Sequence, residues 1–100
     1  MSNRWRPEAK LAERTYKLAR PYLESLPSRS MFHSPDASIR DTLCAGHWSD
    51  AVAHMLYLGW QPDPTTREAI WRMWIIHNYD AEIEAALKFE SWTKRRTMPR

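Results

Sequence analysis

Hydrophobic residues recur at helical spacing from close to the start of the chain. Pro7 suits a first helical position, where its missing N–H is not needed. Pro21 lies inside the pattern and predicts a kink or break near Arg20, and Pro27 predicts the end of the helix. The expected inward face of this first helix comprises Leu11, Thr15, Leu18, Tyr22 and Leu26.

Capping signals predict two further helices in the middle of the chain. Ser34, followed by Pro35 and Asp36, has the pattern of an N-cap, a first-turn proline and a first-turn acid. Gly46 predicts a left-handed stop for this second helix. A third helix is expected to start at Ser49 and Asp50 and to stop at Gly59. The expected packing residues of these two helices are Ile39, Leu43, Val52, Met55 and Leu56.

The last third of the chain predicts two more helices. After a rigid turn at 61–64, Thr65 and Glu68 fit a capping box for a helix over about 66–77. That helix is apolar nearly all round, so we expect it to be the most buried. Asn78 is expected to form a left-handed cap, and Asp80 to cap a fifth helix. The fifth helix is expected to carry Ile83, Ala86, Leu87 and Ser91 inward and a Glu84–Lys88 ion pair.

These elements predict an all-α protein. No alternating apolar run indicates a strand, and the chain has only two glycines, which disfavours a turn-rich β-fold and a glycine-rich phosphate loop. The predicted architecture is a compact single-domain bundle of about five short helices over residues 1–100. Residues 1–6 and 94–100 are expected to be frayed.

Six tryptophans among 100 residues are more than a core of this size easily buries. Tryptophan is enriched at binding surfaces, so part of the set is interpreted as an interface. Trp71 and Trp74 are expected in the core. The predicted partner-binding residues, all expected to be exposed, are Trp5, Arg14, Lys17, Asp36, Trp48, Asp50, Trp60 and Asp63.

Charge is unevenly distributed along the chain, whose formal net charge is +3. Basic segments at both ends flank an acidic middle at 31–66. A stripe at helical spacing, headed by Trp5, and a tail that follows Trp92 combine basic and aromatic groups, as nucleic-acid-binding surfaces do. The residues of this alternative, nucleic-acid-binding site are Arg6, Lys10, Arg14, Lys17, Lys94, Arg95 and Arg96.

Other chemistry finds little support in the residue pattern. The four histidines show no metal-binding spacing, and no nucleophile elbow is present, so we expect no metal, no cofactor and no enzymatic activity. Cys44, the single cysteine, is expected to be a buried structural thiol. A helix-turn-helix over 36–58 would have a recognition helix with no Arg, Lys, Asn or Gln to read bases. Without an apolar signal segment or membrane span, we expect a cytoplasmic protein.

Two resemblances accompany these patterns. Ala51, Met55, Gly59, Pro62, Asp63 and Thr66 follow the spacing of a pentatricopeptide repeat, although the helix is three residues short and no second copy follows. We interpret this as shared helix–Gly–Pro-Asp turn chemistry, and no base-reading residue is carried over. In its size and general character, without a signature motif, the chain resembles small accessory inhibitors of phages and mobile elements, of the anti-CRISPR type.

The sequence therefore predicts a small non-catalytic protein that binds and blocks or modulates a host macromolecular complex. That complex is expected to be one that handles nucleic acid, of the CRISPR type, and to be bound through a protein surface. The alternative is a protein that binds DNA or RNA directly, without sequence specificity. A third possibility is self-association that buries the spare tryptophans in a homodimer.

Overall fold

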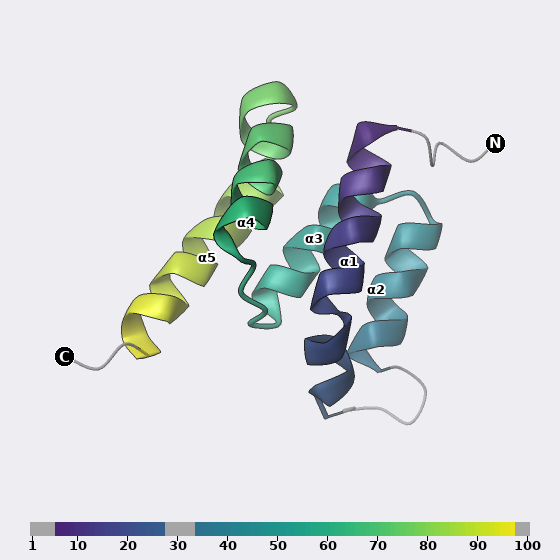
Figure 1. The fold of residues 1–100 in the computed structure, drawn as a ribbon, viewed down its shortest axis with the longest axis vertical. Helices are drawn as coiled ribbons and strands as arrows, with labels where there is room; N and C mark the ends of the chain where they lie inside the picture. Colours follow the sequence, from purple (N-terminus) through teal and green to yellow (C-terminus); the bar gives the residue numbers. More distant parts are fainter. Residues whose placement is uncertain (1–5, 28–33, 98–100) are drawn as a thin grey trace.

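The computed structural model describes residues 6–27 and 34–97, with side chains described as far as Glu90. The described residues form five α-helices, one of which continues into a π-helical segment, and contain no strand (Figure 1). The predicted all-α fold is therefore confirmed. The elements are α1 (Pro7–Ser25), α2 (Pro35–Cys44), α3 (Trp48–Tyr57), α4 (Pro64–Trp71), η1 (Arg72–His77) and α5 (Ala81–Thr97).

Helix α1 runs through Pro21 without ending. Of the kink or break predicted near Arg20, the break does not occur: Pro21 is exposed, so water can satisfy the carbonyl of Lys17 that loses its N–H partner. The helix instead ends at Ser25. Leu26 has an extended backbone, as expected of a residue that precedes a proline.

Both glycines end helices in the way predicted. Gly46 has φ +82° and follows α2, and Gly59 has φ +100° and follows α3. Each allows a six-residue backbone hydrogen bond, from His47 N–H to the Thr42 carbonyl at 3.1 Å and from Trp60 N–H to the Met55 carbonyl at 3.2 Å. This is the Schellman arrangement, which satisfies carbonyls that the helix leaves free.

The N-terminal caps agree with the predictions at two helices and differ at a third. The Ser34 hydroxyl accepts a hydrogen bond from Ala37 N–H at 3.1 Å, and the Asp80 carboxylate accepts one from Ile83 N–H at 3.1 Å, as predicted. The capping box at Thr65 is wrong. Asp63 caps α4 instead, because Pro64 takes the first helical position and the Asp63 carboxylate accepts from Thr66 N–H at 3.3 Å.

The ends of α3 and α5 differ from expectation in smaller ways. Helix α3 begins at Trp48, one residue before Ser49. Asn78 has φ −133°, so its predicted left-handed cap is wrong. Helix α5 continues to Thr97, so the backbone of 94–97 is helical where fraying was predicted. The predicted fraying of 1–5 and 98–100 lies outside the described residues.

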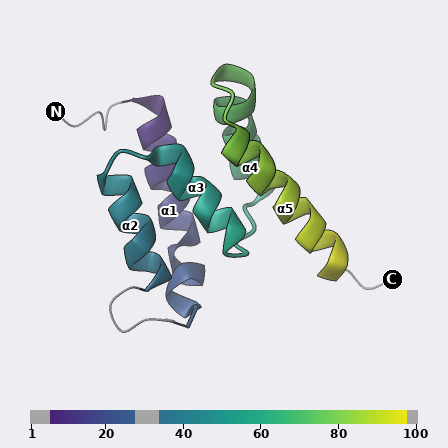
Figure 2. The same ribbon diagram turned by 180° about the vertical axis from the view of Figure 1, so that it is seen from behind.

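Helix α3, and not the helix predicted over 66–77, is the centre of the fold. It contacts α1 and α2 on one side and α5 on the other, as Figures 1 and 2 show from opposite directions. The α4–η1 segment buries only Ile70 and Trp74. It packs at the edge of this arrangement, so Ala69, Met73 and Ile75 are only partly buried and Trp71 and Ile76 are exposed. The buried residues of α3 are Ala51, Val52, Ala53, Met55 and Leu56.

The buried face of α1 is set by small side chains. Leu11 and Thr15 are buried as predicted, and the Thr15 hydroxyl donates to the Leu11 carbonyl at 2.7 Å. Leu18, however, is 52% exposed, so its predicted inward position is wrong. The face turned toward the core contains several alanines, whose small side chains let the helices approach closely. Leu18 does not lie on that face. The remaining buried residues of α1 are Ala9, Ala12, Ala19 and Leu23.

Candidate interaction surfaces

The tryptophans do not divide between surface and core as predicted. Trp60 is only 8% exposed, because it follows Gly59 at the position of a Schellman turn where an apolar residue packs back on the helix. Trp71, expected in the core, is 46% exposed, whereas Trp74 is buried as expected. Trp48 is half-buried. Trp5 lies outside the described residues.

Asp36 was predicted to meet a partner, but it is buried within the protein. Its carboxylate accepts a hydrogen bond from the Tyr16 hydroxyl at 2.6 Å and lies 3.4 Å from Nε of Arg40. Burial, and then this hydrogen bond to Asp36, raises the pKa of Tyr16 to about 12. Asp36 therefore joins α1 to α2, and its prediction as a contact residue is wrong.

Two other predicted acids are exposed, but one of them has a structural role. The Asp63 carboxylate accepts hydrogen bonds from the hydroxyl and the N–H of Thr66, which lower the pKa of Asp63. Asp50 is exposed, and its carboxylate lies 3.9 Å from Nδ1 of the exposed His47 side chain. Of the predicted acidic contacts, only Asp50 remains without a structural task.

Cys44 is exposed at the last position of α2, so the predicted buried thiol is wrong. The apolar face of α2 is short, with Ile39 fully buried and Leu43 half-buried beside the core. Cys44 is one residue further round the helix from Leu43, a rotation of about 100° that carries its side chain off this narrow face.

The predicted basic stripe forms one face of α1. Arg6, Lys10, Arg14 and Lys17 are all exposed. At 3.6 residues per turn they fall within an arc of about 80°, and they span about 16 Å along the helix axis. The arc lies opposite the alanine row that packs on the core. We call these four residues the cationic face.

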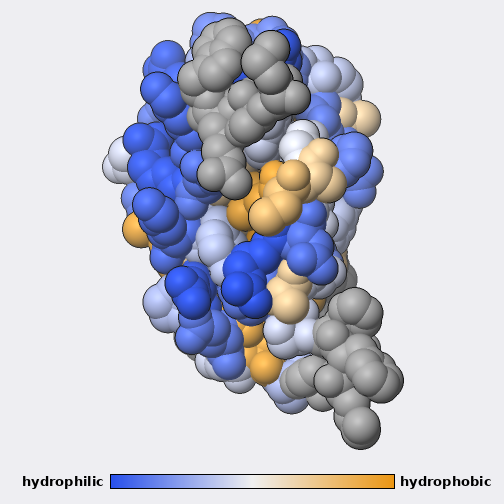
Figure 3. Space-filling model, turned by 90° about the vertical axis from the view of Figure 1, so that its right-hand side faces the viewer, coloured by the Kyte–Doolittle hydropathy of each residue, from blue (hydrophilic) through white to orange (hydrophobic). Residues whose placement is uncertain are grey.

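No carboxylate neutralises the cationic face. None of its four side chains forms an ion pair within the described part of the chain, although Glu13 borders the arc. Each of the other described Lys and Arg side chains does have a carboxylate partner. These ion pairs are Arg20–Glu24, Arg40–Asp36, Arg67–Glu90, Arg72–Glu68 and Lys88–Glu84, with N–O distances of 2.5–3.8 Å. Figure 3 shows that the side of the molecule formed by α1 and α2 is mainly hydrophilic.

The second predicted basic segment is remote from this face. Lys94, Arg95 and Arg96 belong to the last turns of α5, although their side chains are outside the described set. Figures 1 and 2 both show that end of α5 on the opposite side of the molecule from α1. The structure therefore does not bring the two predicted basic patches together.

An apolar surface that the sequence did not predict lies on α4 and η1. Trp71, Ile76 and Tyr79 are 46%, 63% and 62% exposed. Trp71 and Ile76 belong to the helix over about 66–77 that the sequence predicts to be the most buried, and Tyr79 follows it. The sequence shows that this helix is apolar on all sides, but it does not show that too few neighbouring helices are present to cover those sides.

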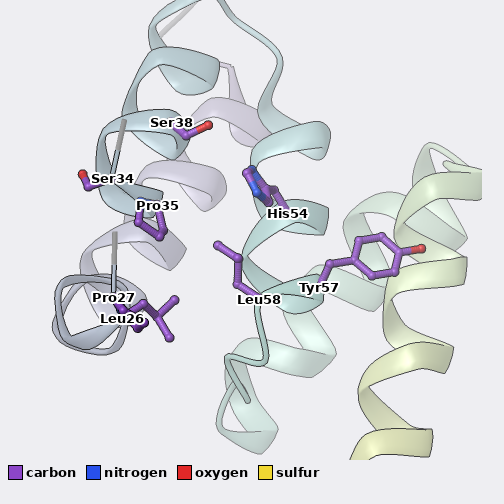
Figure 4. Close-up of a pocket in the computed structure, with 8 residues that line it drawn as sticks. All are labelled: Leu26, Pro27, Ser34, Pro35, Ser38, His54, Tyr57 and Leu58. Atoms are coloured by element: carbon purple, nitrogen blue, oxygen red, sulfur yellow. The ribbon is translucent and has the colours of Figure 1, made fainter. Parts of the chain in front are cut away.

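An open groove of about 560 Å³ lies where the ends of α1 and α3 meet the start of α2 (Figure 4). Its polar side chains are few, and the Ser34 hydroxyl already caps α2. Among the described residues that line it, His54 is the one imidazole. No nucleophile–base pair is formed there by the lining residues, which are Leu26, Pro27, Ser34, Pro35, Ser38, His54, Tyr57 and Leu58.

Two other kinds of site find no support in the described residues. They include no group of three or more His, Cys, Asp or Glu side chains that could hold a metal ion. None of their helices is both long enough and apolar enough to cross a membrane.

Comparison with known proteins adds no relative. No protein-family model, curated protein or solved structure matches the chain. The resemblance to anti-CRISPR inhibitors therefore stays a prediction. The segment that resembles a pentatricopeptide repeat does form a helix, a left-handed glycine and a turn capped by Asp63, but its helix, α3, is buried between α1, α2 and α5.

Proposed function

We propose that this protein binds nucleic acid through the phosphate backbone, using the cationic face of α1. The observation that carries the proposal is the absence of any ion pair at Arg6, Lys10, Arg14 and Lys17, in a protein whose other described cations are all paired. Four uncompensated cations on one exposed helix face attract a polyanion and release its counterions on binding.

The dimensions of the face suit a phosphate backbone. Its length of about 16 Å corresponds to about five nucleotides of one strand, at 3.4 Å of axial rise each. Because each neutralised phosphate contributes about −0.9 to the salt dependence of binding to duplex DNA, four contacts give a slope of about −3.6. An increase from 50 to 200 mM salt would then lower the affinity about 150-fold.

The four side chains of this face are Arg and Lys, which contact phosphates whatever the base sequence. Side chains that distinguish base pairs in the major groove are chiefly Asn, Gln and Arg held against base edges. Helix α1 contains no Asn or Gln, and Arg6 and Arg14 have no hydrogen bond or ion pair among the described residues that would hold them in one orientation. Binding is therefore proposed to be independent of sequence and to involve no catalysis. The single cysteine requires no oxidising compartment, so we place this activity in the cytoplasm.

The test is the salt dependence of binding to a fluorescein-labelled DNA duplex of mixed sequence, measured by anisotropy. Wild-type protein should give a slope near −3.6, and Lys10→Ala/Arg14→Ala should reduce it to about −1.8. Arg72→Ala is the matched control, because Arg72 is exposed but paired with Glu68. Binding that is insensitive to salt, or that Lys10→Ala/Arg14→Ala leaves unchanged, would refute the proposal.

Docking on a protein of a host complex remains the second candidate. The residues first predicted for it give it little support, because Trp60 and Asp36 are buried and Asp63 caps a helix. What favours a protein partner is the exposed apolar surface on α4 and η1, which is a different site.

A further inference from the structure

The exposed apolar surface depends on the π-helical geometry of η1. In an α-helix, a residue five positions after Trp71 would be rotated about 140° away from it. In the π-helix Arg72–His77 the hydrogen bonds run from residue i to i+5, and the wider turn leaves the fifth residue closer to the side of the first than an α-helix would. Ile76 therefore lies nearer to the side of Trp71, and the half-buried Ile75 precedes it in the chain.

A third exposed apolar side chain, that of Tyr79, follows Trp71 and Ile76 just after the end of η1. Tyr79 is 62% exposed, and its hydroxyl is already satisfied by donating to Glu84 at 2.8 Å. Its ring is therefore free to pack without burying an unpaired hydroxyl. We call Trp71, Ile76 and Tyr79 the η1 surface.

Carboxylates surround the C-terminal end of the η1 surface. Glu8 of α1 accepts a hydrogen bond from the Asn78 side chain at 3.4 Å, and Glu84 lies against Tyr79. Asp80 and the exposed Glu82 follow immediately in the chain.

The half of the molecule that carries this surface is acidic. Residues 63–90 contain three Lys or Arg and six Asp or Glu, a net charge of −3. Residues 6–25, which carry the cationic face, contain five Lys or Arg and three Glu, a net charge of +2. The phosphate backbone that suits α1 is therefore repelled by the surroundings of the η1 surface.

We propose that the η1 surface binds a basic amphipathic helix of a partner protein. Trp71 and Ile76 would contact the apolar side of that helix, and the carboxylates around Tyr79 would face its Lys and Arg side chains. This site is separate from the cationic face and does not depend on the protein's binding nucleic acid. A protein with both surfaces would hold a basic protein segment beside a nucleic acid.

A second copy of the chain is less well matched to this surface. In a two-fold symmetric dimer the same patch meets itself, so the carboxylates of one protomer would face those of the other. A basic segment meets both the apolar residues and the carboxylates with complementary groups. Charge complementarity therefore favours a basic helix over a second copy of the chain at the η1 surface.

The test uses two fluorescein-labelled helical peptides of about 18 residues that share one leucine face. One has lysine on its polar face and the other has glutamate, and anisotropy reports their binding to the full chain. The lysine peptide should bind and the glutamate peptide should not. Ile76→Ser should weaken binding of the lysine peptide about tenfold or more, because it removes an apolar anchor. Glu82→Lys should weaken it as well.

Leu18→Ser is the matched control, since Leu18 is a similarly exposed apolar residue on α1. Ile76 is 63% exposed, so its replacement should leave the helical circular dichroism spectrum unchanged. Equal binding of both peptides, or equal effects of Ile76→Ser and Leu18→Ser, would overturn the proposal. So would a dimer in sedimentation that Ile76→Ser abolishes, which would assign the surface to a second copy. None of these outcomes bears on the DNA salt slope, so the two proposals fail separately.

Discussion

Replacing Gly59 by alanine would combine two costs that a matched substitution at Gly46 can separate. Both glycines have a positive φ, +100° at Gly59 and +82° at Gly46. An alanine in left-handed backbone costs about 1–2 kcal/mol. A Cβ at Gly46 would meet no atom within 4 Å, so Gly46→Ala should lower the free energy of unfolding by this backbone cost alone.

At Gly59 a steric cost is added. A Cβ there would lie 2.6 Å from the Tyr22 hydroxyl oxygen, which donates a hydrogen bond to the Leu58 carbonyl at 2.7 Å. The phenol would have to move, and the hydrogen bond would be lost at a cost of about 1 kcal/mol. Gly59→Ala is therefore expected to cost about 2–3 kcal/mol in total.

Urea unfolding followed by circular dichroism measures these costs. The decisive comparison is Gly59→Ala in a Tyr22→Phe background. Without the hydroxyl, the nearest remaining atom of residue 22 is Cζ, at 3.8 Å from the new Cβ, an ordinary contact. The cost of Gly59→Ala should then fall to that of Gly46→Ala. Equal costs of the two alanines in the wild-type background, or a Gly59→Ala cost that Tyr22→Phe does not change, would refute the reasoning.

Two further predictions concern single contacts. Because folding raises the pKa of Tyr16 from 10.0 to about 12, its contribution to stability is complete below pH 10 and is lost as the pH rises toward 12. Tyr16→Phe should remove the tyrosine that ionises near pH 12 in an ultraviolet absorbance titration; loss of a tyrosine that ionises near pH 10 would mean that burial and the bond to Asp36 do not raise the pKa of Tyr16. Asp63→Ala should cost about 1 kcal/mol in urea unfolding through loss of the α4 cap, and Thr65→Ala close to nothing. Equal losses of stability from Asp63→Ala and Thr65→Ala would indicate that Thr65 also caps α4, as the capping box predicts.

Features that depend on neighbouring residues were predictable from the sequence. Ser34 and Asp80 cap their helices, and Gly46 and Gly59 end theirs, because each acts on backbone groups within a few positions. The cationic face belongs to this class, since helical spacing alone brings its residues to one side. Even among these features two local signals can compete: the sequence predicts Thr65 as the cap of α4, but Asp63, two positions earlier, caps it.

Burial was much harder to predict, because it depends on which elements meet. Asp36 looks like an exposed first-turn acid, but its partner Tyr16 lies 20 positions earlier in the chain. Trp60 and Trp71 exchanged their expected roles because a Schellman turn folds one inward and an edge helix leaves the other uncovered. Trp71 and Ile76 are both exposed, and no residue in the segment indicates that the helix changes from α to π between them.

Ion pairing shows the same division within the candidate site. The partners of Arg20, Arg72 and Lys88 are four positions away and could be read from the sequence, whereas Glu90 is 23 positions from Arg67. That the cationic face has no ion pair within the described residues follows only once every other Lys and Arg side chain among them has been assigned a carboxylate in three dimensions.

The two left-handed glycines also bear on how this chain can diverge in evolution. Gly46 and Gly59, the only glycines of the chain, stand before and after α3, and the interval between them is set by the length of that helix. Each residue inserted or deleted within α3 would rotate one part of its buried face by about 100° relative to the other. Distant relatives could exchange most surface residues, including the exposed tryptophan and cysteine, and still need this glycine interval. A search for them is therefore better guided by the spacing of the two glycines than by overall identity.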